Sequence, residues 1–189
     1  MNSITKSDFR KDCIKKLKFC KQTAKLKKDK YISNEILKII KFEKATNILL
    51  YLPLDIEVDV RLLIKYLRRS KKYKIFVPFM VGKSLKIVPY RLPLKKKQYN
   101  IYEPNNSHLS YKVQIDLAIV PVIGIDKSVR RVGFGVGFYD RFFGSLNYKP
   151  TIVFTQLCSC YTNTILTFEH DIKADYIVTA NNKGAKWKI

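Results

Sequence analysis

The segment RVGFGVGFYDR, residues 131–141, is the part of the sequence whose residue types and spacing most clearly favour chemistry. Five of the seven glycines of the chain fall between Gly124 and Gly144. Glycine lets a backbone approach a ligand closely, although it costs about 0.5–1 kcal/mol relative to alanine inside a regular element. Backbone N–H groups in such a loop bind phosphate oxygens, and Arg130 and Arg131 can hold the phosphate charge. The segment therefore favours a phosphate-binding loop.

Neither of two standard nucleotide-binding motifs occurs in this segment. Its G-x-G-x-G spacing differs from the G-x-G-x-x-G dinucleotide fingerprint, and it lacks the lysine and hydroxyl of a P-loop. A bulged β-hairpin with glycine at positive φ is an alternative explanation of the spacing. Asp140 favours the ligand-binding interpretation, because Mg²⁺ takes only one or two carboxylates when it is shared with nucleotide phosphates.

The elements that must position these residues alternate between helix and strand. Apolar residues at three- and four-residue intervals predict helices over 5–28, 33–45 and 59–70, the second capped near Ser33. Short apolar runs predict strands over 47–53, 73–78, 84–90, 116–123, 151–156 and 175–180. Residues 91–115 are expected to form loops with at most one short element. This alternation favours one α/β domain with a largely parallel sheet.

Polar residues follow several of these predicted strands. In open α/β sheets the ligand binds beyond the carboxyl ends of the strands. Asp55, Glu57 and Asp59 come after the first strand, and the glycine segment follows the strand over 116–123. We therefore expect the site to be built from these segments.

The chain is strongly basic, with a formal net charge of +22 from 37 Lys and Arg against 15 Asp and Glu. Nucleic acid is one partner that such a charge suggests. However, lysine outnumbers arginine by 29 to 8 and is scattered along the whole chain, whereas base and phosphate recognition favours arginine. A lysine-rich surface that attracts small anions is therefore the favoured explanation, and nucleic-acid binding is the less favoured one.

Size, hydropathy and cysteines define the class of protein further. The 189 residues, 47% of them hydrophobic, are enough for one domain with a core. No apolar run approaches the ~20 residues of a membrane span, and the N-terminus lacks a secretory pattern, which indicates a cytoplasmic protein with no membrane partner. The cysteines match neither a disulfide framework nor a zinc site, so we expect buried, reduced thiols. They are Cys13, Cys20, Cys158 and Cys160.

The wider segment VPVIGIDKSVRRVGFGVGFYDRFF, residues 120–143, resembles the signature of 5-formyltetrahydrofolate cyclo-ligases, also called methenyltetrahydrofolate synthetases. Further segments match that family in the same order: Lys6 and Arg10 as its N-terminal K-x-x-x-R, YLPLDIEVD at 51–59, IYEP at 101–104 and HDIKADYIVT at 170–179. The resemblance implies a single three-layer α/β/α, Rossmann-like domain over residues 1–189, with a largely parallel sheet and N-terminal helices.

The resemblance also implies a reaction. Enzymes of this family use Mg²⁺ and ATP to close 5-formyltetrahydrofolate into 5,10-methenyltetrahydrofolate, with release of ADP and phosphate. They phosphorylate the formyl oxygen, which is otherwise a poor leaving group, before the neighbouring folate nitrogen attacks the carbon. Positioning and charge neutralisation would then supply most of the catalysis. The expected substrates are ATP and 5-formyltetrahydrofolate, also in polyglutamylated form, and we expect a monomer.

Roles at the nucleotide follow from the same resemblance. Lys6 and Arg10 would hold ATP phosphates, and Arg131 with the glycine loop would wrap the triphosphate. Asp140 and Asp171 match the family's magnesium-binding aspartates. The full nucleotide-binding set is Lys6, Arg10, Arg131, Gly133, Phe134, Gly135, Val136, Gly137, Phe138 and Tyr139.

On the folate side, Glu57 matches the acid that hydrogen-bonds the pterin-like ring. Tyr139 would lie where the two substrates meet, and Arg131 and Tyr139 are the expected catalytic residues. The folate pocket would be lined by Leu52, Phe134 and Phe138.

Without the resemblance, these residue types also fit structural roles. Lys6 and Arg10 fit a solvated helix surface, and Glu57 fits an acid at a helix N-terminus, where the helix dipole favours it. Asp171 fits a turn cap. The two aromatic residues before Asp140 fit a hydrophobic core.

The sequence departs from the family pattern at three places. Val129 replaces a glycine, and since valine does not easily adopt positive φ, we expect a different turn there. Val136 stands where lysine or glycine is common, and Phe138 replaces a tyrosine. We expect an active enzyme with altered nucleotide or folate affinity; a folate- or nucleotide-binding protein that has lost catalysis is the alternative.

Overall fold

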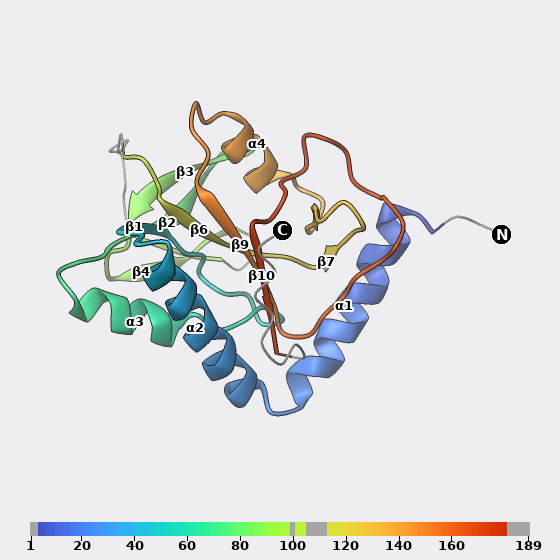
Figure 1. Cartoon of the computed structure of the whole chain (residues 1–189), viewed down its shortest axis with the longest axis horizontal. Coiled ribbons are helices and arrows are strands. Elements are labelled where there is room, and N and C mark those ends of the chain that lie inside the picture. The colour runs from blue at the N-terminus through green and yellow to red at the C-terminus, as the bar shows by residue number, and fades with distance from the viewer. Residues whose placement is uncertain (1–3, 99–100, 105–112, 181–189) are drawn as a thin grey trace.

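A six-stranded sheet forms the centre of the computed structural model, which describes residues 4–98, 101–104 and 113–180 (Figure 1). In spatial order the strands are β10 (Tyr176–Thr179), β9 (Thr151–Gln156), β6 (Leu117–Pro121), β1 (Asn47–Leu49), β2 (Lys74–Val81) and β3 (Ser84–Pro89). Neighbouring strands from β10 to β2 pair in parallel, and β3 pairs antiparallel with β2. The predicted strands and the largely parallel sheet are confirmed.

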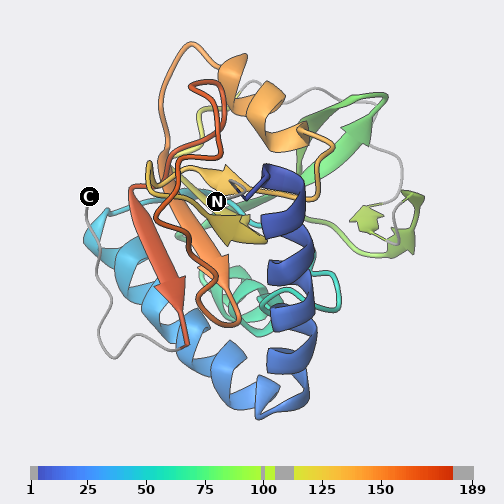
Figure 2. The same cartoon turned by 90° about the vertical axis from the view of Figure 1, so that its right-hand side faces the viewer.

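Helices cover both faces of this sheet. They are α1 (Lys6–Gln22), α2 (Lys25–Phe42), α3 (Arg61–Arg69) and α4 (Phe138–Gly144). Figure 2 shows α2 and α3 on one side of the sheet and α4 on the other. Within the described ranges, no helix combines the length and the apolar composition needed to cross a membrane.

Alternating side chains of the strands build two apolar layers, because successive strand residues point to opposite faces. Ile48 packs in the layer with the buried residues of α1, α2 and α3, whereas Leu49 packs in the layer with Phe142 of α4. In the same way Ile119 joins the first layer and Val120 the second. The three-layer α/β/α arrangement is therefore confirmed, and it explains why the strand sequences are apolar at consecutive positions.

Two small antiparallel pairs extend from the sheet. They are β4 (Leu94–Lys96) with β5 (Tyr102–Pro104), and β7 (Gly124–Ile125) with β8 (Arg131–Val132). The first pair corrects the expectation of at most one short element in residues 91–115, of which 99–100 and 105–112 lie outside the described residues. Both pairs border the site described below.

The boundary between the first two helices differs from the prediction. The chain leaves the helix after Gln22 and re-enters it at Lys25, with Ala24 in the left-handed conformation at φ 47°. Ser33 therefore lies buried inside α2 and caps nothing. The break carries no glycine or proline, and the apolar period continues through it, so the local sequence gave no signal for it.

The expectation of reduced thiols was wrong. Cys13 of α1 is bonded to Cys160, and Cys20 of α1 to Cys158, with Cα–Cα distances of 5.7 and 6.5 Å. Cys13, Cys158 and Cys160 are buried, as expected. The partners are 147 and 138 residues apart in the chain, and only the packing of α1 against the segment after β9 brings them together. Spacing within C-x6-C or C-x-C therefore held no information about the pairing.

The turn between β7 and β8 is built around the buried carboxylate of Asp126. This carboxylate accepts hydrogen bonds of 2.6–3.0 Å from the amides and hydroxyls of Ser128 and Thr167 and from the Leu166 amide. Burial raises the pKa of Asp126, but the hydrogen bonds outweigh it and hold the pKa at about 2. The network ties the turn to the segment that leads to Asp171.

Asp126→Asn is expected to lower the free energy of unfolding by about 2–4 kcal/mol near neutral pH, because an amide nitrogen would face donors. The carboxyl pKa is lower in the folded chain than the ~3.9 of an unfolded chain, so its stabilisation is present above ~pH 4 and is lost toward ~pH 2. Urea unfolding near neutral pH and at about pH 3 measures both effects. A difference that does not shrink in acid would contradict the charged network. The exposed Asp12→Asn is the control, with a change below about 0.5 kcal/mol.

Val129 occupies the left-handed region, with φ 61°, in the same turn. The expectation that valine would force a different turn was therefore wrong. Two hydrogen bonds hold the strained residue: its amide donates to the Asp126 carbonyl at 2.9 Å, and its carbonyl accepts from the Ala174 amide at 3.2 Å. The surrounding contacts thus impose a conformation that the side chain disfavours.

Val129→Gly is expected to be about 1 kcal/mol more stable than Val129→Ala, because a Cβ in the left-handed conformation costs about 1–2 kcal/mol. Both variants lose the same valine methyl groups, so the pair isolates the backbone term. At an ordinary position the order is reversed, with alanine ahead by about 0.5–1 kcal/mol. Urea denaturation of the two variants decides between these orders.

Candidate active site

Two cavities meet at the loop between β8 and α4, residues 133–137, which we call the glycine loop. The apolar cavity has a volume of about 450 Å³ and the basic cavity one of about 680 Å³. The apolar cavity is lined by Leu52, Leu54, Glu57, Pro78, Met80, Leu85, Ile101, Tyr102, Glu103, Pro121, Arg131, Phe134, Val136, Gly137, Phe138 and Tyr139. The basic cavity is lined by Lys6, Arg10, Arg131, Gly133, Gly135, Val136, Gly137, Asp140, Arg141, Gly144, Ser145, His170 and Asp171. Three residues of the glycine-loop region belong to both: Arg131, Val136 and Gly137.

The glycine loop itself is an open turn. Gly135 and Gly137 have φ of 98° and 73°, a conformation that residues with a Cβ rarely adopt. Among the described residues, the amides of Gly133, Gly135 and Gly137 donate to no oxygen, so they remain open to a ligand. The alternative interpretation of this segment was a β-hairpin. A hairpin is present, formed by β7 and β8, but it ends at Val132, before the first of these glycines.

Arginine side chains support the loop. The Nε of Arg10, from α1, donates to the Gly133 carbonyl oxygen at 2.8 Å. The guanidinium of Arg10 also lies against Gly135, where an added Cβ would come within 3.5 Å of it. Arg10 of α1 therefore contacts the glycine loop, although Arg10 and Gly133 are 123 residues apart in the chain.

Arg131 separates the two cavities. Its side chain is buried, and Nε and Nη2 donate to the two carboxylate oxygens of Asp140, both at 3.2 Å. The guanidinium lies 5.0 Å from the centre of the Tyr139 ring, in a cation–π contact. Asp140 also accepts a hydrogen bond from the Ile172 amide at 3.2 Å. This pairing holds the arginine in a defined orientation between the cavities.

Lys6 and Asp171 form a second ion pair in the basic cavity, with an Nζ–Oδ2 distance of 2.7 Å. The carboxylate also accepts the Phe168 amide at 2.8 Å, so the turn-cap role of Asp171 is present as well. Two carboxylates in one cavity, Asp140 and Asp171, suit Mg²⁺, which takes one or two carboxylates and completes its shell with phosphates and water. Among the described residues, no group of three or more His, Cys, Asp or Glu side chains is arranged to hold a metal ion.

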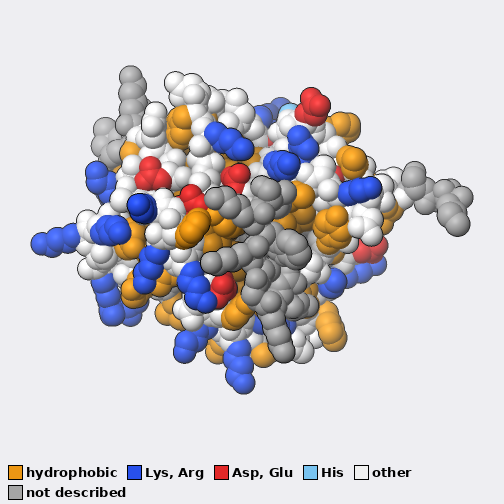
Figure 3. Space-filling view, viewed as in Figure 1, with side chains coloured by type: hydrophobic (Ala, Val, Ile, Leu, Met, Phe, Trp, Pro, Cys, Tyr) orange, Lys and Arg blue, Asp and Glu red, His pale blue; other side chains and the backbone are white. Residues whose placement is uncertain are grey.

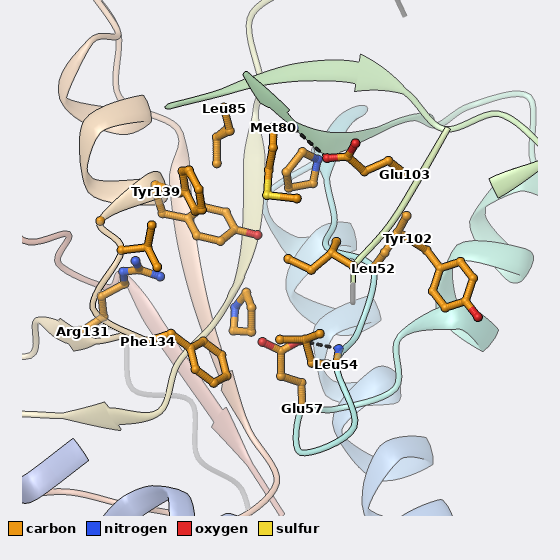
Figure 4. A pocket seen from close by; sticks show the side chains of 16 residues that line it. Leu52, Leu54, Glu57, Met80, Leu85, Tyr102, Glu103, Arg131, Phe134 and Tyr139 are labelled. Carbon is orange, nitrogen blue, oxygen red and sulfur yellow. Dashed lines mark hydrogen bonds between the residues drawn. The ribbon is translucent and has the colours of Figure 1, made fainter. Parts of the chain in front are cut away.

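Glu57 is one of the two acids that line the apolar cavity. Its Oε2 accepts the Leu54 amide at 2.7 Å, and Figure 4 shows its carboxylate pointing into the cavity. Burial raises the pKa of Glu57 to about 7, against the opposing effects of the Leu54 amide and the Arg131 charge. The carboxyl group of Glu57 therefore changes charge near neutral pH.

Tyr139 lies on the opposite wall, with its hydroxyl inside the cavity (Figure 4). Burial, followed by the negative charge of Glu57, raises the pKa of the Tyr139 hydroxyl above its usual value, although Arg131 lowers it. The hydroxyl is therefore protonated at neutral pH and available as a hydrogen-bond donor. Leu52, Phe134 and Phe138 line the same cavity.

Every residue of the catalytic, nucleotide, folate and metal sets implied by the resemblance lines one of these cavities. Phe134, Phe138 and Tyr139, which belong to the expected nucleotide set, line the apolar cavity and not the basic one. Arg130, which the sequence also suggested for the phosphate, lines neither cavity. The other acids after β1 also line neither cavity: Asp55 pairs with Lys21, and Asp59 pairs with Arg61. The sequence analysis did not identify the residues of β2, β3 and β5 that line the apolar cavity, which include Pro78, Met80, Leu85 and Tyr102. It also assigned no role to Glu103, although that residue lies in the IYEP match; its buried carboxylate accepts the Met80 amide at 2.7 Å. Arg141 was missed in the basic cavity.

On the face of the molecule seen in Figure 3, the basic side chains do not gather at one place. Figure 3 shows lysine and arginine side chains spread over that face of the molecule, with apolar and acidic groups between them. This distribution agrees with the favoured interpretation of a solvated basic surface.

The chain is similar in sequence to known proteins. A model of the 5-formyltetrahydrofolate cyclo-ligase family matches residues 2–180. A 5-formyltetrahydrofolate cyclo-ligase of Haemophilus influenzae is 28% identical over 147 residues, which cover 74% of this chain and 78% of that protein. The mouse protein of the same name is 22% identical over 188 residues, 92% of each chain.

Solved structures agree on the fold. The 5,10-methenyltetrahydrofolate synthetase of Aquifex aeolicus superposes with a TM-score of 0.71 at 23% identity, covering 95% of this chain and 91% of that one. The synthetase of Mycoplasma pneumoniae superposes with a TM-score of 0.67 at 22% identity, covering 93% and 98%. With a family match over nearly the whole sequence and the family's fold, this chain belongs to the 5-formyltetrahydrofolate cyclo-ligase family.

Proposed function

We propose that this protein uses ATP and Mg²⁺ to convert 5-formyltetrahydrofolate into 5,10-methenyltetrahydrofolate, ADP and phosphate. One observation carries the proposal: an apolar cavity and a basic cavity share Arg131, Val136 and Gly137, so two different ligands can meet at the glycine loop. The apolar cavity suits a folate ring system, and the basic cavity suits a triphosphate. One chain builds both, so the reaction needs no second copy.

The chemistry assigns a task to each cavity. The formyl oxygen attacks the terminal phosphorus of ATP, and the electron pair of the broken P–O bond leaves with ADP. The neighbouring folate nitrogen then attacks the formyl carbon and releases its proton to solvent, and the oxygen departs as phosphate. Arg131 would neutralise the charge of the transferred group between the cavities, and Tyr139 would donate a hydrogen bond to the reacting oxygen. Glu57 would accept hydrogen bonds from the pterin-like ring.

The remaining residues hold the nucleotide. Lys6, Arg10 and the glycine-loop amides would bind phosphate oxygens, and Asp140 and Asp171 would hold the metal. Mg²⁺ would neutralise part of the triphosphate charge. Because both carboxylates are ion-paired in this structure, we expect Lys6 and Arg131 to exchange carboxylate oxygens for phosphate oxygens when the nucleotide binds.

Mixing the protein with 5-formyltetrahydrofolate and Mg-ATP, and following the near-ultraviolet absorbance of the methenyl product, tests this function. We expect growth of the absorbance that requires ATP. Binding of both ligands without growth would identify a binding protein that has lost catalysis. RNA retained through purification, with affinity that falls steeply with salt, would favour the nucleic-acid alternative.

A further inference from the structure

Arg141, in the last turn of α4, is a cation held in place by the backbone of two other segments. Its Nε donates to the Lys83 carbonyl oxygen at 2.8 Å, and its Nη2 donates to the same oxygen and to the Val136 carbonyl at 2.8 Å. Lys83 lies in the turn between β2 and β3, and Val136 lies in the glycine loop. The guanidinium is therefore positioned before any ligand binds.

The charge of Arg141 has no counterion within the described part of the chain. The basic cavity contains four cationic side chains and two carboxylates, namely Lys6, Arg10, Arg131 and Arg141 with Asp140 and Asp171. The carboxylates pair with Lys6 and Arg131. Arg141 binds only carbonyl oxygens, so its full positive charge is left for an anion.

The free end of the guanidinium lies where the two cavities meet. Nη1 donates to no oxygen among the residues that the structure describes. It lies against Gly137, where an added Cβ would come within 2.8 Å of it. The guanidinium also lies 5.7 Å from the centre of the Phe138 ring, which lines the apolar cavity. A side chain at position 137 would force the guanidinium to move away.

We infer that Arg141 binds the terminal phosphate of ATP, on the side that faces the folate; this inference rests on the proposed function. The formyl oxygen forms a bond to the terminal phosphorus while the bond from phosphorus to the bridging oxygen breaks, and that electron pair leaves with ADP. Nη1 of Arg141 donates to an oxygen of the phosphoryl group during the transfer and offsets its charge. ADP lacks this group, so Arg141 distinguishes the two nucleotides.

Calorimetric titration of Arg141→Met with Mg-ATP and with Mg-ADP tests the inference. We expect the Kd for ATP to rise about tenfold, the effect of one charge-assisted hydrogen bond, and the Kd for ADP to change less than about twofold. Arg141→Lys keeps the charge without the fork and should recover part of the ATP affinity. The matched control is Arg68→Met, which removes an arginine that stacks on Tyr90 and lines neither site cavity; it should change neither Kd.

Equal losses of ATP and ADP affinity would overturn the inference, because a residue that merely ties the glycine loop to the β2–β3 turn acts on both nucleotides. Unchanged affinity for both would overturn it as well. Product formation by the wild-type protein is measured separately. A protein that binds ATP but forms no methenyl product refutes the proposed function, and the comparison of ATP with ADP still decides the role of Arg141.

Discussion

Arg131→Met is expected to lower kcat/KM for both substrates by about a thousandfold. The guanidinium lies in both cavities, pairs with Asp140 and stacks on Tyr139, so its removal affects the phosphate side and the folate side together. Arg131→Lys keeps the charge but cannot hold both carboxylate oxygens, and we expect a loss of about a hundredfold. Initial rates of methenyl formation, with each substrate varied in turn, measure these effects.

The controls for Arg131 separate chemistry from folding. Removing the cation leaves the partly buried Asp140 carboxylate without its ion-pair partner, which lowers stability; a fully buried ion pair loses about 3–5 kcal/mol in this way. The double variant Arg131→Met, Asp140→Asn removes that cost, and its melting temperature shows whether the chain is folded. Arg130→Met is the matched single variant, since Arg130 is adjacent and lines neither cavity. A folded double variant with wild-type turnover would refute the catalytic role.

Glu57→Gln is expected to lower kcat/KM for 5-formyltetrahydrofolate by about a hundredfold and to remove its pH dependence near neutrality. The pKa of Glu57 is raised to about 7, and only the ionised form accepts hydrogen bonds through both oxygens. In the wild type, kcat/KM for folate should therefore rise with pH through 7 and level off. Rate profiles between about pH 5.5 and about pH 8.5 measure it, because kcat/KM reports the free enzyme.

The control for this profile is His170→Gln, in the basic cavity. If Glu57 causes the rise near neutral pH, the rise persists in His170→Gln and disappears in Glu57→Gln. The KM for ATP should change less than about threefold in Glu57→Gln, since the side chain does not line the basic cavity. The opposite pattern, a rise lost only in the histidine variant, would show that Glu57 does not control the profile.

The same variant has a consequence for stability. The carboxyl pKa of Glu57 is higher in the folded chain than the ~4.3 of an unfolded chain, so the folded state binds more protons between these two values. Its contribution to stability therefore falls as the pH rises through that window. We expect Glu57→Gln to gain stability relative to the wild type on moving from acid to neutral pH, a difference that urea unfolding detects.

Several local patterns in the sequence were sufficient by themselves. The period of apolar residues predicted α3 and all six strands of the central sheet, because burial on both faces requires apolar residues at consecutive positions. The glycine loop and Asp140 were recognisable because a close backbone approach to a ligand requires glycine at particular positions. The family resemblance added Lys6 and Glu57, which on their own also fit a helix surface and a helix N-terminus.

Other features depended on packing between segments far apart in the chain. The pairing of Cys13 with Cys160 and the contact of Arg10 with Gly133 join residues that no local period connects. The backbone conformation of Val129 could not be predicted from its residue type either. Valine disfavours positive φ, but hydrogen bonds to the surrounding backbone hold Val129 there. The sequence alone predicted α3 and the strands of the central sheet, and it marked the glycine loop as a candidate ligand-binding segment. Only the tertiary structure decided that Arg131 separates two cavities and that Arg141 is held beside Gly137, because these positions result from contacts among several elements.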